Sequence, residues 1–484
     1  MKLSFLAQQI PGGYSLMGED TDIRELSTDS RNTQEGSLFF CTPGFVSDGH
    51  DFAPDAVRRG AAALVVERFL PIDVPQIRVR SVREASGYIA SAFYGFPSRD
   101  LKLIGLTGTK GKTTTSYLVK SILESAGKKT GLIGTVCSMI GDEVIPSRLT
   151  TPDTVELQRL LSSMRDAGME YVVMEVSAHA LALARLAGLT FEVGAFTNFS
   201  QDHLDLFKSM DDYFEAKMRF FTPGQVKHAV YNADDEKVAE GMKRADCDAI
   251  RIGIREKSDI YANNIEIRER GCSFDLSWHR HYRRNLSISL TGIFNVYNCL
   301  MAAGIAAAAG IDEESTAAGL ERVRNVPGRF ELLDTATDYR VILDYAHSPD
   351  SLENVLKAVR ATGSGRLVAL FGCGGNRDKA KRPIMGEIGG RLADMCILTD
   401  DNPRMEEPMD ILAAIEEGIK PTGCEYRVIQ NRREAIRYAL TNAKPGDTIV
   451  LAGKGHETYQ EIRGVKYPFD EKVVVAEILD EMGI

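Results

Sequence analysis

The feature that most restricts the fold is a glycine-rich turn between an apolar run and a helix-like segment, at residues 103–115. A strand that enters a helix through such a turn directs backbone N–H groups and the positive end of the helix dipole at one point, where a polyphosphate can bind. The loop is more compact than the standard G-x-x-x-x-G-K-[ST] pattern, because Gly108 stands only three residues before Gly111. We predict a phosphate-binding loop in which Lys112 reaches the β- and γ-phosphates and Thr113 reaches a magnesium ion.

Strand, turn and helix signals repeat along the chain after Leu101. Apolar runs of strand length alternate with segments of helix length, and this order predicts a doubly wound, mainly parallel sheet. The strands are expected at residues 101–106, 131–134, 171–176, 193–197 and 228–231.

Alternating apolar and polar residues at 272–278 and 286–290 predict an antiparallel hairpin appended to this sheet. An alanine-rich helix is expected to follow at about 295–309. The basic run at 279–284 lies at the expected turn of the hairpin, and we interpret it as a solvated tip.

Two further α/β units flank the central one. Residues 1–98 predict a small N-terminal α/β domain with buried strands at 38–41 and 61–66. Residues 99–327 then form the central domain, and residues 328–484 a C-terminal domain with a second open, Rossmann-like sheet. The strands of this third domain are expected at residues 340–344, 366–371, 395–399 and 448–452.

Polar residues follow two of the predicted central strands. Glu175 closes the run at 171–174, and His203 lies in the polar segment after the strand at 193–197. Ligands of open parallel sheets bind at the carboxyl ends of the strands. We therefore expect Glu175 and His203 to join Thr113 in a magnesium site.

Composition excludes several classes of function. The 484 residues carry a formal net charge of -10, which disfavours binding to nucleic acid. The eight cysteines contain no C-x-x-C pair, which favours reduced thiols over disulfides or a zinc site. The first residues lack the flanks and length of a secretory signal, and no apolar run approaches about 18 residues. We expect a cytoplasmic protein with no membrane partner.

Several motifs in a fixed order resemble those of the Mur ligase family, and the resemblance covers nearly the whole chain. Within the family, residues 150–152, 401–404 and 453–457 are similar to the branch that adds a diamino acid. The family motifs lie at residues 107–114, 175–179, 197–203, 292–298, 327–329 and 344–347.

The resemblance implies an ATP-dependent amide ligase of peptidoglycan synthesis. Such an enzyme joins meso-2,6-diaminopimelate to UDP-N-acetylmuramoyl-L-alanyl-D-glutamate through an acyl phosphate, and releases ADP and phosphate. Positioning and electrostatic stabilisation supply most of this catalysis. ATP is the co-substrate and Mg²⁺ the cofactor. A monomer that acts on small molecules is expected.

The resemblance also assigns residues to the nucleotide and the metal. Lys217 corresponds to a carbamylated lysine, N6-carboxylysine, which turns a cation into an oxygen ligand. Catalytic roles fall to Lys112, Glu175, His203 and Lys217, and metal ligands are Thr113, Glu175, His203 and Lys217. ATP-binding positions are Gly108, Thr109, Lys110, Gly111, Lys112, Thr113, Thr114, Asn295, Arg329 and Asp344.

The resemblance also assigns binding residues to the two other substrates, the UDP-muramoyl-peptide and diaminopimelate. Arg404 is expected to choose diaminopimelate, because the distal carboxylate of this amino acid needs a guanidinium partner. Leu183 departs from the family, some of whose members have a glutamine there, and it is not assigned. Residues for the UDP-muramoyl-peptide are Ser30, Thr150, Thr151, Ser177 and Arg185, and residues for diaminopimelate are Arg377, Asp401, Asn402, Pro403, Arg404, Gly453 and Glu457.

Alternatives remain open. A lysine-adding ligase of the same family is disfavoured by Arg404, and folate-polyglutamate or cyanophycin-type ligases share only part of the motif set. A regulatory ATPase that performs no ligation is a further hypothesis, but it would not explain the motifs at residues 150–151 and 401–404. The glycine-rich segment at 372–377 resembles a dinucleotide fingerprint only weakly, because Arg377 replaces its last glycine.

Overall fold

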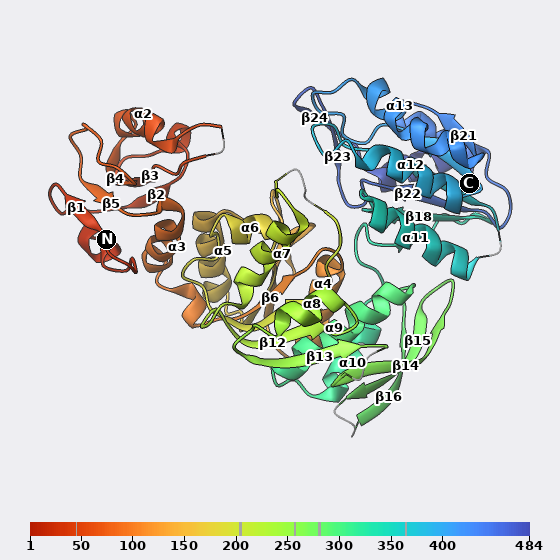
Figure 1. Ribbon diagram of the computed structural model, residues 1–484, viewed down its shortest axis with the longest axis horizontal. Helices are drawn as coiled ribbons and strands as arrows, with labels where there is room; N and C mark the ends of the chain where they lie inside the picture. Colours follow the sequence, from red (N-terminus) through yellow and green to blue (C-terminus); the bar gives the residue numbers. More distant parts are fainter. Residues whose placement is uncertain (45, 203–205, 256–257, 279–281, 364) are drawn as a thin grey trace.

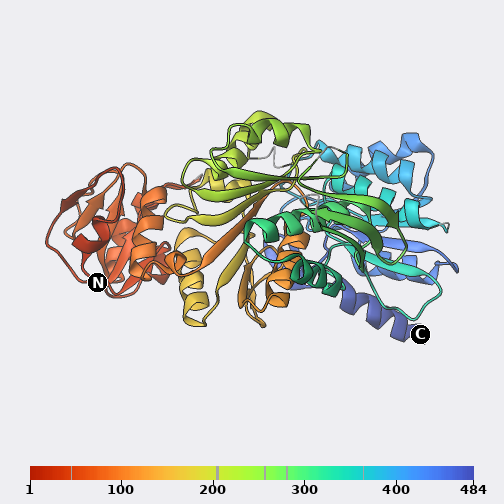
Figure 2. The ribbon, with the colours of Figure 1, turned by 90° about the horizontal axis from the view of Figure 1, so that it is seen from below.

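The computed structural model describes residues 1–44, 46–202, 206–255, 258–278, 282–363 and 365–484. Three α/β domains follow one another along the chain, each built on its own sheet. Figures 1 and 2 show the N-terminal domain at one end, the central domain in the middle and the C-terminal domain at the other end. Within the described ranges, no helix combines the length and apolar character needed to cross a bilayer.

The N-terminal domain is a five-stranded sheet in the order β1-β5-β4-β3-β2, parallel except for β1. Helix α3 packs against α5 of the central domain, and it also closely approaches the segment of that domain that contains Ala187. A Cβ atom on Gly87 of α3 would lie 2.2 Å from the carbonyl oxygen of Ala187. The elements are α1 (Leu3–Ala7), β1 (Ser15–Met17), β2 (Glu25–Ser27), β3 (Ser37–Phe40), α2 (Ala53–Arg58), β4 (Ala61–Val66), β5 (Gln76–Arg78) and α3 (Val82–Phe93).

The central domain contains an eleven-stranded sheet in the order β16-β15-β14-β13-β12-β11-β6-β10-β7-β8-β9. The strands from β14 to β7 in this order are parallel. An antiparallel hairpin forms each edge of the sheet, β15–β16 at one edge and β8–β9 at the other. The five predicted strands are confirmed to within two residues at each end. The strands are β6 (Lys102–Thr107), β7 (Thr130–Ile133), β8 (Cys137–Ile140), β9 (Glu143–Pro146), β10 (Tyr171–Glu175), β11 (Phe191–Phe196), β12 (Val226–Asn232), β13 (Asp248–Gly253), β14 (Ile260–Ile267), β15 (Cys272–Trp278) and β16 (Tyr282–Ile288).

The prediction of a solvated tip for the basic run at 279–284 is wrong for Arg284. Residues 279–281 lie outside the described residues, but Arg284 belongs to strand β16. Its guanidinium pairs with Glu314 and, at 3.5 Å, with Glu321. Both carboxylates come from α10, so this cation fastens the edge strand to a helix.

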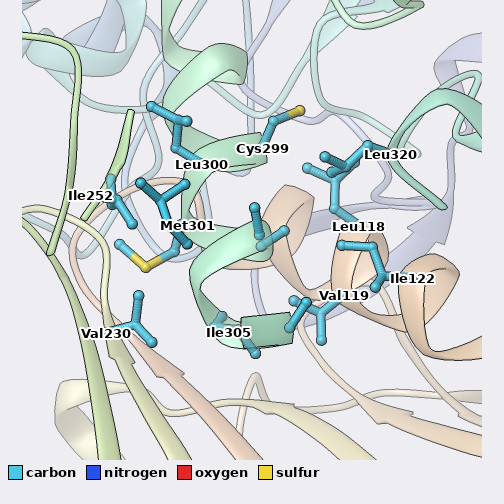
Figure 3. Close-up of a cluster of buried hydrophobic side chains, with 14 of the residues drawn as sticks. Leu118, Val119, Ile122, Val230, Ile252, Cys299, Leu300, Met301, Ile305 and Leu320 are labelled. Atoms are coloured by element: carbon cyan, nitrogen blue, oxygen red, sulfur yellow. The ribbon is translucent and has the colours of Figure 1, made fainter. Parts of the chain in front are cut away.

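Helix α9 forms the centre of the main core, as Figure 3 shows. Its alanine-rich sequence is apolar on every side, as is typical of a buried helix. A Cβ atom on Gly304 would lie 2.6 Å from Val230, so the glycine lets α9 approach β12 closely. Leu118 and Ile122 of α4 pack on the other side. The helices are α4 (Lys112–Ser125), α5 (Thr154–Asp166), α6 (Ala178–Ala182), α7 (Met210–Met218), α8 (Glu236–Met242), α9 (Ile293–Ala308) and α10 (Glu313–Arg322).

The C-terminal domain has a six-stranded sheet in the order β17-β18-β22-β19-β20-β21, with only β17 antiparallel among the described strands. From β19 the chain moves outward to β21 and then returns through α14 to β22, so the strand order reverses between β19 and β22. Ligands of open α/β sheets bind at such a reversal.

The four strands predicted for this domain are confirmed as β18, β19, β20 and β22, whereas β17, β21, β23 and β24 were not predicted. The elements of the domain are β17 (Glu331–Leu332), β18 (Arg340–Asp344), α11 (Pro349–Thr362), β19 (Leu367–Phe371), α12 (Lys381–Leu392), β20 (Met395–Leu398), α13 (Pro408–Ile419), β21 (Glu425–Val428), α14 (Arg432–Thr441), β22 (Thr448–Ala452), β23 (Tyr459–Ile462), β24 (Val465–Pro468) and α15 (Glu471–Glu481).

Candidate active site

A cavity of about 1190 Å³ lies between the carboxyl ends of the central strands and the C-terminal domain. The central domain lines it with the glycine-rich loop, and the C-terminal domain lines it with residues around Tyr345 and Asp350. The site residues predicted from the sequence that line this cavity are Thr109, Lys110, Gly111, Lys112, Thr113, Thr114, Thr150, Thr151, Glu175, Ser177, Arg185, Lys217, Asn295, Arg329, Asp344 and Arg377.

The glycine-rich loop takes a backbone path that only glycine follows easily. Gly108 has a φ of 140° and Gly111 a φ of 84°. A Cβ atom would lie 1.9 Å from the Thr197 hydroxyl at the first position and 2.4 Å from Asn298 Oδ1 at the second. Helix α4 begins directly after Gly111, which has no side chain to cap it. The first N–H groups of the helix therefore remain available to an anion.

Two lysines converge on this loop. Lys112 Nζ donates to the carbonyl oxygens of Gly108, at 2.8 Å, and Thr109, at 3.1 Å. Lys217 Nζ, on α7, also donates to Gly108, at 2.8 Å. Burial lowers the pKa of Lys112 to about 8. Burial first, and then the charge of Lys112, hold the pKa of Lys217 well below 10.5, and only 1% of this residue is exposed.

Glu175 lies at the end of β10 with its carboxylate held from two sides. It accepts from the Thr113 hydroxyl at 3.1 Å, and from both the N–H and the hydroxyl of Thr135 at 2.9 Å. The described residues contain no group of three or more His, Cys, Asp or Glu that could hold a metal. A carboxylate beside a hydroxyl nevertheless fits Mg²⁺, which uses one or two carboxylates together with substrate phosphates. His203 lies outside the described residues.

The residues predicted for the peptide substrate form one network beside Glu175. Thr151 donates to the Glu175 carbonyl at 2.8 Å and accepts from the Ser177 N–H at 3.0 Å. Arg185 donates to the Thr151 carbonyl at 2.9 Å. Thr135 links Thr150 to this network through a 3.0 Å hydrogen bond. This network fixes polar side chains on one wall of the cavity.

Ser30, predicted for the same substrate, is not brought to this cavity. It lies in the N-terminal domain, in the short turn after Asp29, and its side chain is buried. Figure 1 shows this domain on the far side of the central domain from the C-terminal one.

Side chains of the central and C-terminal domains contact each other beside the cavity. Arg329 donates to the Thr113 hydroxyl at 3.1 Å, and its guanidinium lies over the Tyr345 ring. Lys110 donates to Ser348 at 2.8 Å and pairs with Asp202 at 3.0 Å. The C-terminal domain therefore touches the glycine-rich loop directly.

Two further predicted nucleotide residues are fixed by their neighbours. Asp344 accepts from the Phe330 N–H at 2.7 Å, and burial raises its pKa to about 6. Asn295, on α9, donates to the Thr291 carbonyl at 2.8 Å and accepts from Asn298 at 2.9 Å. Protein neighbours therefore fix the position of both side chains.

The residues predicted for diaminopimelate meet at the reversal of the C-terminal sheet. Asn402 donates to Glu457 at 2.8 Å. A Cβ atom on Gly453 would lie 2.8 Å from an Asp401 carboxylate oxygen, so the loops at 401–404 and 453–457 are in contact.

A third loop, at 372–377, contacts the loop at 401–404. Arg404 has a φ of 52°, donates to the Gly375 carbonyl at 2.9 Å and pairs with Glu461 at 3.3 Å. The Pro403 carbonyl lies against Gly375, where a Cβ atom would approach it to 1.9 Å. Arg377, in the same loop, lines the cavity described above. Of the residues predicted for diaminopimelate, Arg377 is in the cavity lining, and the loops at 401–404 and 453–457 lie behind it.

Sequence reasoning missed two residues of this region. Thr135 orients Glu175 but carries no recognisable signal, because it lies in a loop 40 positions away. Lys454 is fully buried and donates to Asn402 at 3.3 Å and Glu457 at 3.1 Å. Lys454 lies within the family motif at 453–457, and this place in the motif could have identified it as a site residue.

Three sequence models match successive parts of the chain. The Mur ligase family catalytic domain matches residues 22–94, the Mur ligase middle domain residues 106–306, and the glutamate ligase domain of Mur ligases residues 328–455.

Full-length relatives carry one name. The UDP-N-acetylmuramoyl-L-alanyl-D-glutamate–2,6-diaminopimelate ligase 1 of Clostridium acetobutylicum is 46% identical over 476 residues, covering 97% of this chain and 98% of its own. The diaminopimelate ligase of Bacillus licheniformis is 45% identical over 490 residues and covers 100% of both chains.

Solved structures agree with these sequences. One with the same ligase name superposes with a TM-score of 0.68 at 32% identity, over 96% of each chain. MurF of Thermotoga maritima in complex with ADP shares the fold, with a TM-score of 0.64 at 20% identity over 95% and 97% of the chains. With the glycine-rich loop, the closing third domain and full-length relatives in agreement, this chain belongs to the Mur ligase family of ATP-dependent ligases.

Proposed function

We propose that this enzyme joins meso-2,6-diaminopimelate to UDP-N-acetylmuramoyl-L-alanyl-D-glutamate, with cleavage of ATP to ADP and phosphate, in the cytoplasmic stage of peptidoglycan synthesis. One observation carries the proposal: the loop at 401–404 contacts both the loop at 453–457 and the loop of Arg377, and Arg377 lines the same cavity as the glycine-rich loop. An amino acid bound by the loops would therefore lie beside the bound nucleotide. We expect a monomer with domain boundaries near residues 98 and 327.

The nucleotide is proposed to bind along the glycine-rich loop. Lys112 and the N–H groups at the start of α4 would hold its phosphates, while Asn295, Arg329 and Asp344 complete the site. Thr113 and Glu175 would hold Mg²⁺, which neutralises charge between the phosphates and the substrate carboxylate when it is bound. Activation of this carboxylate as an acyl phosphate then allows an amine to attack it.

Lys217 is proposed to be carbamylated. Its buried amine lies close to the loop, and a lowered pKa keeps a fraction of this amine neutral and nucleophilic toward CO₂. Attack of the neutral amine on CO₂ forms an N–C bond and releases one proton to solvent. The product is an anion, so a residue that otherwise adds positive charge beside Lys112 becomes an oxygen ligand. Its negative charge would also balance Lys112.

The peptide substrate is proposed to lie along the wall made by Thr150, Thr151, Ser177 and Arg185. Arg185 pairs with Asp153 at 2.9 Å, and 15% of its side chain is exposed. It can turn its guanidinium to a carboxylate or phosphate of the substrate. The uridine end would reach Ser30 in the N-terminal domain.

Diaminopimelate carries a carboxylate and an ammonium at its far end, and the three loops offer a partner for each. Arg404 supplies a planar guanidinium for the carboxylate. Glu457, joined to Asn402, supplies an anion for the ammonium. L-Lysine lacks that carboxylate and would leave Arg404 with only its protein partners.

Phosphate release tests the proposal. Purified protein would be incubated with ATP, Mg²⁺ and UDP-muramoyl-dipeptide, and with diaminopimelate, L-lysine or no amino acid. We expect release with diaminopimelate and a product whose mass rises accordingly. Release with lysine alone would identify a lysine-adding ligase, and release in the absence of any amino acid would identify a regulatory ATPase.

A further inference from the structure

A buried ion pair lies behind the loops that we assign to diaminopimelate. Arg432 is the first residue of α14 and Glu471 the first residue of α15, and each is 1% exposed. Arg432 Nε donates to Glu471 Oε1 at 2.8 Å. Replacing a buried ion pair by apolar residues is often neutral or stabilising, so stability alone is a weak reason for this pair.

Two further N–H groups of Arg432 bind carbonyl oxygens at the end of β22 and just beyond the end of β20. Nη1 donates to the Asp400 carbonyl at 3.1 Å, and Nη2 donates to the Ala452 carbonyl at 2.9 Å. Asp400 directly precedes the loop at 401–404, and Ala452 directly precedes the loop at 453–457. Strand β19 separates β20 from β22, so one guanidinium spans the intervening strand.

The spacing of these strand ends determines whether the loops can meet. Asn402 and Glu457 form a 2.8 Å hydrogen bond, and Lys454 contacts both of them. A relative shift of the strand ends would move Asn402 away from Glu457. Arginine suits this role because its rigid, planar group presents several donors at fixed angles, whereas lysine has a single flexible ammonium.

We propose that Arg432, oriented by Glu471, is a positioning residue that sets the distance between the two amino-acid-binding loops. The pair does not touch the substrate and acts through the Asp400 and Ala452 carbonyls. This inference rests on the proposed function, since it concerns the site that this function assigns to diaminopimelate.

Steady-state kinetics of two variants test the inference. Arg432→Lys keeps the charge but not the three-way geometry, and the double variant Arg432→Met/Glu471→Met removes the pair without leaving a buried charge. In both we expect the KM for diaminopimelate to rise about 10- to 100-fold, because small displacements of positioning groups have effects of this size. The KM values for ATP and the UDP-precursor should stay near those of the wild type.

Arg366 offers a matched control at the opposite, amino-terminal ends of the strands of the same sheet. It pairs with Asp447 at 2.8 Å and donates to the Asn442 carbonyl at 2.9 Å, beside the amino ends of β19 and β22. Arg366→Met removes an arginine that also ties β19 to β22. We expect it to lower the thermal unfolding temperature and to leave the KM for diaminopimelate unchanged.

Three outcomes would overturn the inference. These are an unchanged KM for diaminopimelate in the folded Arg432 variants, a parallel rise of all three KM values, or a failure of both variants to fold, which would assign the pair to the sheet itself. A wild-type enzyme that does not use diaminopimelate would instead refute the proposed function. If the wild type uses diaminopimelate and the Arg432 variants have the same KM for it, only the proposed role of Arg432 is refuted.

Discussion

Lys112 and Lys217 donate to the same carbonyl oxygen, that of Gly108, and each nitrogen lies 2.8 Å from it. Two ammonium groups at one acceptor repel each other, and burial adds to the cost of charging either. Carbamylation of Lys217 would remove this repulsion, because the carbamate is negatively charged.

Removing CO₂ and bicarbonate should lower kcat of the wild type by about tenfold or more, as expected when the ligand shell of a metal is damaged. Added bicarbonate should restore it. With ¹³C-labelled bicarbonate, NMR should show one carbamate signal that is lost in Lys217→Arg and kept in Lys112→Arg. Full activity of Lys217→Ala, or a signal that survives Lys217→Arg, would contradict carbamylation at this residue.

Asp400 should make the folded protein less stable as pH rises. Burial raises the pKa of its carboxyl from 3.8 to about 6, so the folded state binds a proton more tightly than the unfolded state. The stabilisation is complete below pH 3.8 and is lost as pH rises through 6. Asp400→Asn should therefore be more stable than the wild type at pH 8, by about 2 kcal/mol, and this advantage should shrink toward pH 4. Urea unfolding at several pH values measures it, and a constant difference would refute the assignment.

Thr135 should set the affinity for magnesium through Glu175. Thr135→Val removes the hydroxyl that donates to the carboxylate at 2.9 Å, while the backbone N–H remains. We expect the Mg²⁺ concentration at half-maximal activity to rise about 10-fold, a typical cost of losing a hydrogen bond to a metal ligand. Thr135→Ser keeps the hydroxyl and serves as the control. Equal defects in both variants would show that packing, and not the hydrogen bond, matters.

Arg404 should separate diaminopimelate from lysine. Arg404→Ala is expected to lower kcat/KM for diaminopimelate about 10- to 100-fold, the range of a lost charged hydrogen bond, and to change the rate with lysine little. The control is Arg463→Ala, because this arginine lies in the adjacent hairpin and its side chain is 77% exposed. If Arg404→Ala reduces activity with both amino acids equally, the guanidinium does not read the distal carboxylate.

The sequence predicted those helices and strands whose pattern of apolar and polar residues is clear within a short segment. Strand β10 is a continuous apolar run because parallel neighbours and helices bury it on both faces. The hairpin β23–β24 was not predicted, because its strands have four residues each and bury neither face: the residues of β23 are half-exposed and those of β24 are exposed. Strand β21 has charged residues at alternate positions on an edge, and its apolar signal is equally weak.

The features of the candidate active site also differ in how far the sequence could predict them. The glycine-rich loop is contiguous, so its geometry could be predicted from residue order. The contact between Arg329 and Thr113 joins residues 216 positions apart, and no local pattern encodes it. The orientation of Glu175 by Thr135 and the burial of Lys454 likewise depend on tertiary packing. Family motifs named several of these positions without giving their contacts.

The edges of the eleven-stranded sheet have a consequence for solubility. An open sheet of this size exposes two rows of unpaired backbone groups that could recruit a second chain. At one edge, Arg283 and Arg284 place charge on β16, and Glu321 accepts from the backbone N–H of Ser287 at 3.1 Å. At the other edge, Pro146 of β9 has no N–H to donate. The hairpins thus protect a long sheet from edge-to-edge aggregation while the enzyme works at the centre of it.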